Sequence, residues 1–88
     1  MNYAHSMCIF NIVPTLYWFR NIVIRIHTRD HPPAHIHAEA PDGKAKINLV
    51  TLQVIEAEGF TKQELNLTVE FISERRQRLL EKWKEVHE

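Results

Sequence analysis

The chain has 88 residues, which is enough for one small domain. Its 11 basic and 11 acidic residues balance, so no strong net charge attracts it to nucleic acid or to a membrane surface. The single cysteine, Cys8, excludes an intramolecular disulfide, and the absence of a signal-peptide pattern agrees with it in predicting a cytoplasmic protein.

The first residues show no clear hydrophobic period. We expect residues 1–12 to be a disordered extension and residues 13–88 to form a single α+β domain. The apolar stretch Met7–Phe19 is interrupted by Asn11 and Pro14 and is too short to span a bilayer. We therefore expect no association with a membrane.

Alternation of apolar and polar residues predicts an antiparallel sheet. The main strands are expected at Ile22–His27, His35–Ala40 and Lys44–Leu49, and Leu16–Phe19 and the segment around Val54 are candidates for short additional strands. The pattern predicts an antiparallel meander of three to four strands. One of its faces is purely apolar and has to be covered.

The period changes at Thr61, where a helix is expected to begin. Thr61 and Glu64 have the spacing of a capping box, in which each side chain satisfies a free backbone amide of the first turn. One long C-terminal helix is predicted, straight or kinked around Ser73–Arg76, to cover the apolar face of the sheet. Its apolar stripe consists of Leu65, Val69, Ile72, Leu79 and Trp83.

The segment Asp30–His37 concentrates three histidines and a carboxylate within eight residues. His35 and His37 are two residues apart on a predicted strand, so both side chains project from the same face. The two prolines before them stiffen a loop that could bring Asp30 or His31 to the same place. This polar face is the most informative feature of the sequence.

Metal binding is one function that these residues suggest. Imidazoles are common ligands of transition metals, and His31, His35 and His37 could together hold a divalent ion such as zinc. A pair of histidines on an exposed strand is also typical of an ordinary solvated surface, and the residues alone do not separate the two interpretations.

Cleavage of RNA without a metal is a second hypothesis. Imidazole titrates near neutral pH, so His35 and His37 could serve as general base and general acid. Arg25 and Lys46 would then hold the phosphate. Asp30, His31 and Lys44 are further candidates for binding residues on the same side of the domain. Lysines that alternate along a strand also occur on surfaces with no ligand.

Four segments match a known family: Pro14-Thr15, Ile22–Arg25, the run Asp30-His31-Pro32-Pro33-Ala34-His35-Ile36-His37-Ala38, and Leu79–Trp83. With these segments the sequence resembles the bacterial domain-of-unknown-function family 4160 from about Val13 to Trp83. Arg75 stands where many members of this family have a helix histidine.

Genes of this family often lie beside a gene for a second small domain with DNA-binding features, and some members are labelled transcriptional regulators. The resemblance therefore implies a small protein-binding module of a regulatory or toxin–antitoxin-like pair. A small protein partner is expected, and RNA is the alternative ligand. A domain of 88 residues with one open polar face also suits protein interaction better than small-molecule catalysis.

Overall fold

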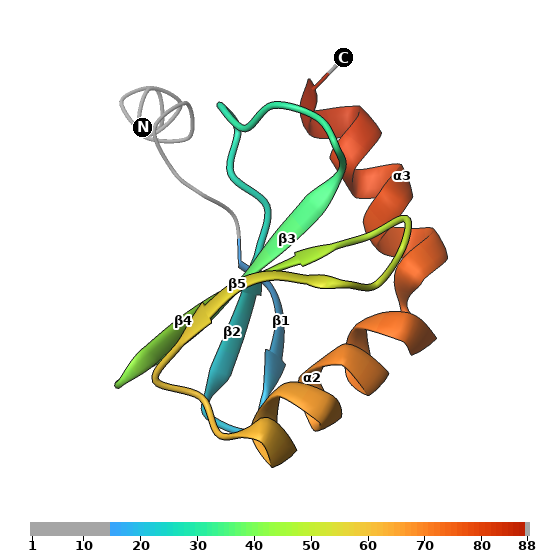
Figure 1. Cartoon of the computed structure of the whole chain (residues 1–88). Coiled ribbons are helices and arrows are strands. Elements are labelled where there is room, and N and C mark those ends of the chain that lie inside the picture. Colours follow the sequence, from blue (N-terminus) through green and yellow to red (C-terminus); the bar gives the residue numbers. More distant parts are fainter. Residues whose placement is uncertain (1–14, 88) are drawn as a thin grey trace, which may run out of the picture.

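The computed structural model describes residues 15–87. These residues form an antiparallel sheet followed by two helices, which confirms the α+β class (Figure 1). The expected extension at residues 1–12 lies outside the described part. The elements are β1 (Thr15–Phe19), β2 (Ile22–Arg25), β3 (His35–Ala40), β4 (Gly43–Asn48), β5 (Val54–Glu58), α2 (Lys62–Glu74) and α3 (Arg76–His87).

The sheet is a meander with the strand order β1-β2-β3-β4-β5, so it has five strands where three to four were predicted. Both short candidate strands pair with a neighbour. Arg20 takes a positive φ of 60° in the turn that brings β1 back along β2. At the other end, the side-chain oxygen of Asn48 accepts hydrogen bonds from the amides of Val50 and Thr51, at 2.7 and 2.9 Å. This loop returns the chain along β4 as β5.

The core lies between one face of the sheet and the helices, as the alternation predicts. The registers of β2, β3 and β4 bring Ile24, Ala38 and Ala45 into one row on this face. Ile36 and Ile47 form the next row, and both are completely buried. Ile72 of α2 and Leu79 and Trp83 of α3 belong to the same buried cluster.

The C-terminal helix is divided at Arg75, so the expectation of one long helix requires correction. The capping box at its start is present, because the Thr61 hydroxyl accepts from the Glu64 amide and the Glu64 carboxylate accepts from the Thr61 amide. The interruption lies within the segment Ser73–Arg76, where a kink was considered. Neither helix described between residues 15 and 87 is long and apolar enough to cross a membrane.

The division coincides with a contact made by Arg76, the first residue of α3. Its Nε donates to the carbonyl oxygen of Leu49 at 2.8 Å, and its Nη2 donates to that of Val50 at 2.9 Å. Arg76 thus satisfies two carbonyls of the β4–β5 loop. At the break, Arg75 has φ −118° and ψ 14°, outside helical geometry, and its amide donates to the Ile72 carbonyl.

We expect Arg76→Ala to destabilise the domain by about 1–3 kcal/mol, because the substitution leaves the Leu49 and Val50 carbonyls without their charged donor. Urea unfolding followed by circular dichroism measures the change. Arg78→Ala, an exposed arginine of the same helix, is the matched control and should stay within about 0.5 kcal/mol of the original protein. Equal stability of the two variants would show that the hydrogen bonds from Arg76 to the Leu49 and Val50 carbonyls contribute nothing to stability.

Candidate functional site

A carboxylate and two imidazoles meet where the loop after β2 folds back onto β3. The Nε2–H of His37 donates to Oδ2 of Asp30 at 2.7 Å. The Nε2 atom of His35 lies 3.0 Å from the same oxygen. Asp30 belongs to the loop and the histidines to β3, so this carboxylate fastens the proline-containing loop to the sheet. We call Asp30, His35, His37 and the neighbouring His27 the His–Asp cluster.

His35 is the most buried member of the cluster, with 6% of the residue exposed. Its ring centroid is 5.3 Å from that of Trp83 in α3. Its Nδ1 is 2.7 Å from the Pro33 carbonyl oxygen, which can only accept, so Nδ1 carries the hydrogen. Nε2 is buried and forms no hydrogen bond with any described residue, since Asp30 is close but badly aligned.

His27 follows β2 and stacks on His37. The ring centroids are 3.6 Å apart and the ring planes differ by 10°. On its other side, Nε2 of His27 is 3.7 Å from Oε2 of Glu39. The second carboxylate oxygen of Glu39 is 3.1 Å from Nε of Arg25. The cluster therefore continues along the polar face of the sheet into an ion pair.

The electrostatics of the cluster favour a charged aspartate and a neutral imidazole. Burial raises the pKa of Asp30, but the hydrogen bond from His37 and the attraction of three neighbouring imidazoles outweigh burial, and the pKa is lowered overall. For His37, burial lowers the pKa more than the hydrogen bond to Asp30 raises it. At neutral pH the site thus offers a carboxylate and an uncharged ring.

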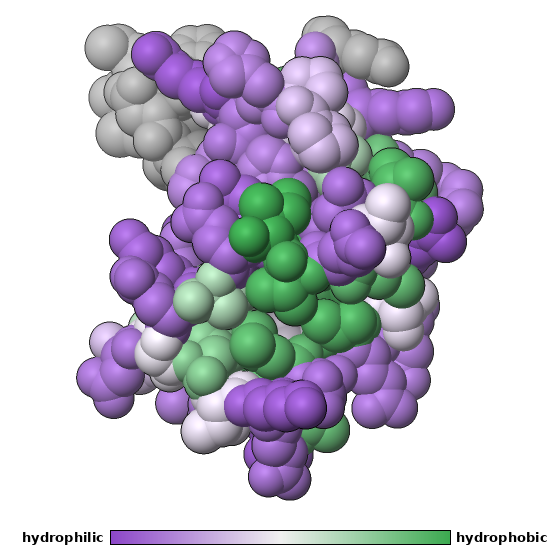
Figure 2. All heavy atoms as spheres, in the orientation of Figure 1, coloured by the Kyte–Doolittle hydropathy of each residue, from purple (hydrophilic) through white to green (hydrophobic). Residues whose placement is uncertain are grey.

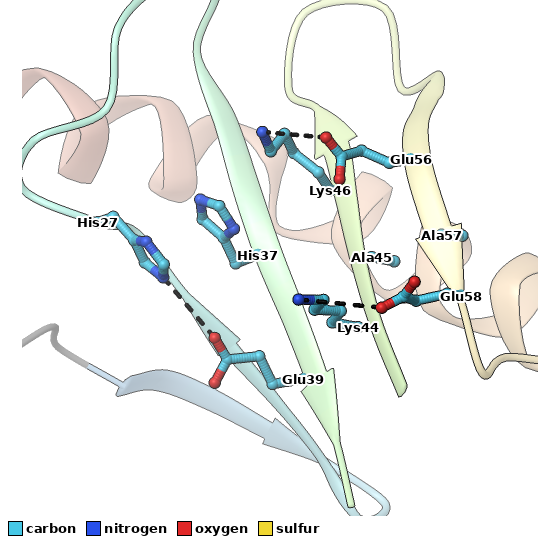
Figure 3. A pocket seen from close by; sticks show the side chains of 9 residues that line it. All are labelled: His27, His37, Glu39, Lys44, Ala45, Lys46, Glu56, Ala57 and Glu58. Carbon is cyan, nitrogen blue, oxygen red and sulfur yellow. Dashed lines mark ion pairs between the residues drawn. The ribbon is translucent and has the colours of Figure 1, made fainter. Parts of the chain in front are cut away.

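An open hollow of about 470 Å³ lies beside the cluster on the polar face of the sheet (Figure 3). His27 and His37 form one wall, and β4 and β5 form the other. Lys46 is 3.5 Å from Glu56 and Lys44 is 3.9 Å from Glu58, so each lysine is paired across these two strands. The hollow is lined by His27, His37, Glu39, Lys44, Ala45, Lys46, Glu56, Ala57 and Glu58.

The structure brings some of the predicted site residues together and separates others. Asp30 joins His35 and His37, as the stiff loop suggested. His31, predicted as a metal ligand, is exposed and does not belong to the cluster, although it lines a second, smaller hollow together with Asp30 and His35.

The cationic candidates already have carboxylate partners. Arg25 contacts Glu39, and the two lysines contact glutamates of β5.

Three residues have the spacing needed to hold a metal ion. One ligand atom from each of His27, Asp30 and His37 lies within 4.8 Å of the other two. Of the three metal ligands predicted from the sequence, His31, His35 and His37, only His37 belongs to this group. The structure thus supports a group that could bind a metal, with different members.

Sequence reasoning missed His27, which is not among the candidate site residues predicted above. The signal was present in the strand register. Arg25 pairs with His37 across β2 and β3, so a residue two positions after Arg25 is a diagonal neighbour of His37 on the same face. Counting diagonal as well as direct neighbours would have added His27 to the candidates.

Comparison with known proteins identifies a family. The family model described as "Domain of unknown function (DUF4160)" matches residues 21–84, which include the whole His–Asp cluster. No protein of curated function and no solved structure matches the chain. Because the match covers well over half of the 88 residues, the chain belongs to the DUF4160 family.

Proposed function

We propose that this domain is a small protein-binding module of a regulatory or toxin–antitoxin-like pair, and that it binds its partner along the free edge of β5. The observation that carries the proposal is the exposure of this strand. All five residues of β5 are exposed, and no segment between residues 15 and 87 pairs with its outer edge. A free edge presents unpaired backbone donors and acceptors to a partner strand.

The surface around β5 is also hydrophobic. Val54 and Ile55 are 39% and 47% exposed, and Val50 in the preceding loop is 55% exposed. Figure 2 shows hydrophobic side chains gathered across the middle of this face, bordered by hydrophilic ones. The helices bury the central strands and leave β5 uncovered. Exposed hydrophobic patches of this kind mark interaction sites in soluble domains.

The charge pattern of β5 specifies the chemistry of the partner. Glu56 and Glu58 lie opposite Lys46 and Lys44, on the polar face of the sheet, and their side chains are about 70% exposed. A strand added beside β5 would place its own residues next to these carboxylates and next to Val54 on the other face. The matching partner is an extended segment in which Lys or Arg alternates with apolar residues.

The geometry gives less support to metal-independent cleavage of RNA. A general acid or base has to come within hydrogen-bond distance of the proton that it transfers. His35 is buried and donates to the Pro33 carbonyl, while His37 donates to Asp30. The proposed phosphate ligand Lys46 is paired with Glu56. A phosphate would have to displace these contacts before either histidine could act on it.

A photo-reactive benzoylphenylalanine placed at Ile55 in the native host should crosslink one small protein, because this side chain lies within the proposed interface. With that protein purified, Ile55→Lys should weaken binding at least about tenfold by placing a charge in the apolar patch. Trp18→Lys, at the exposed hydrophobic residue of β1, is the matched control and should leave the affinity unchanged. Equal losses in both variants would exclude β5 as the docking edge.

Expression of the chain alone separates the binding module from an RNA-cleaving toxin. We expect the original protein and a His35→Ala/His37→Ala variant of equal solubility to permit the same bacterial growth, because neither imidazole is free to act on RNA. Growth curves and the integrity of total RNA provide the measurement. Arrest by the original protein, with recovery in the variant, would contradict the binding module and support the toxin.

A further inference from the structure

We propose that the domain also binds one divalent transition-metal ion of the zinc class. The ligands are His27, Asp30 and His37, and Nε2 of His35 lies beside Asp30 next to this group. Its ligands lie in the loop after β2 and in β3, so zinc binding and docking at β5 are tested by separate measurements.

The spacing of the donor atoms is close to that of a zinc site. Zinc lies about 2.0–2.2 Å from imidazole nitrogen and carboxylate oxygen, so two ligands of a tetrahedral ion are about 3.4 Å apart. In the cluster, ligand atoms of His27, Asp30 and His37 are already within 4.8 Å of each other. The 2.7 Å contact between Asp30 and His37 is a hydrogen bond, and the ion would replace its proton. The rings of His27 and His37 are stacked and nearly parallel, so both would have to tilt before their nitrogens could face one ion.

His35 supplies an independent observation that points to a ligand. The Nδ1–H bond to the Pro33 carbonyl leaves Nε2 as the atom with the free electron pair in the neutral ring. This atom is buried, lies 3.0 Å from Oδ2 of Asp30, and has no hydrogen bond within the described residues. A buried acceptor without a donor is costly, and a cation beside it removes that cost.

The surroundings of the cluster have the features of an outer coordination shell. Histidines that bind metal usually donate their second ring N–H to a carbonyl or a carboxylate, which fixes the orientation of the ring. His35 donates to the Pro33 carbonyl, and Nε2 of His27 faces the carboxylate of Glu39. The nearby cations are offset by acidic partners, Arg25 by Glu39 and Lys46 by Glu56.

The donor set indicates the class of ion. Two imidazoles and one carboxylate suit zinc and its first-row neighbours, whereas calcium and magnesium require mostly oxygen ligands. Three protein ligands leave the fourth position of a tetrahedral ion to a water molecule. Because Asp30 belongs to the loop and His37 to β3, we expect the ion to hold the proline loop against β3.

Titration of the untagged, chelator-treated full chain with zinc against a chromophoric chelator tests the proposal. One zinc ion should bind per chain, and bound cobalt(II) should show the intense visible absorption of a four-coordinate site. His37→Ala should weaken zinc binding more than about 100-fold, beyond the loss typical of an outer-shell change. Magnesium at the same concentration should not compete.

His31→Ala is the matched control, because His31 is exposed on the same loop and lies outside the cluster. It should bind zinc as the original protein does. If His37→Ala does not fold, Asp30→Asn replaces it, since the amide oxygen can still accept from His37 while the charged ligand is lost. Failure of the original chain to bind zinc, or an equal loss in His31→Ala and in the cluster variant, would overturn the site.

Discussion

Alternation of side chains along β3 determines both the core and the candidate site of this domain. Ile36 and Ala38 are completely buried in the core that the helices cover. The pleat therefore directs His35 and His37 to the opposite face. A slip of one residue in this strand would exchange the two sets, burying imidazoles in the core and exposing Ile36 to water. The free energy that holds the isoleucines in place thus also positions the histidines.

Features confined to one element could be predicted from the sequence. The alternation of apolar and polar residues predicted the three central strands and their shared apolar face, because burial of one face leaves little freedom in the register of strand pairing. The capping box at Thr61 marked the start of α2 for a similarly local reason, since the hydrogen bonds join residues three apart. The stiff loop correctly suggested that Asp30 approaches the β3 histidines.

Contacts between distant elements could not be predicted in this way. Arg76, next to the division of the helix, binds carbonyls 26 and 27 residues earlier in the chain, which no helical period can indicate. The burial of His35 likewise depends on Trp83, whose place follows from the packing of α3. The exposure of β5 reflects the limited area that two helices can cover, although the alternation of its residues resembles that of a covered strand.

Lys46 connects the two proposed surfaces. It pairs with His37 in the register of β3 and β4, and its ammonium group is 3.5 Å from Glu56 on β5. An ion bound by His37 would repel Lys46 and strengthen its contact with Glu56. A basic partner strand at β5 needs the carboxylate of Glu56 for itself. If both proposals hold, the ion and the partner would compete for one charge, and the effect would be modest because Glu56 is exposed to solvent. A bound ion would for this reason disfavour a basic partner at the β5 edge.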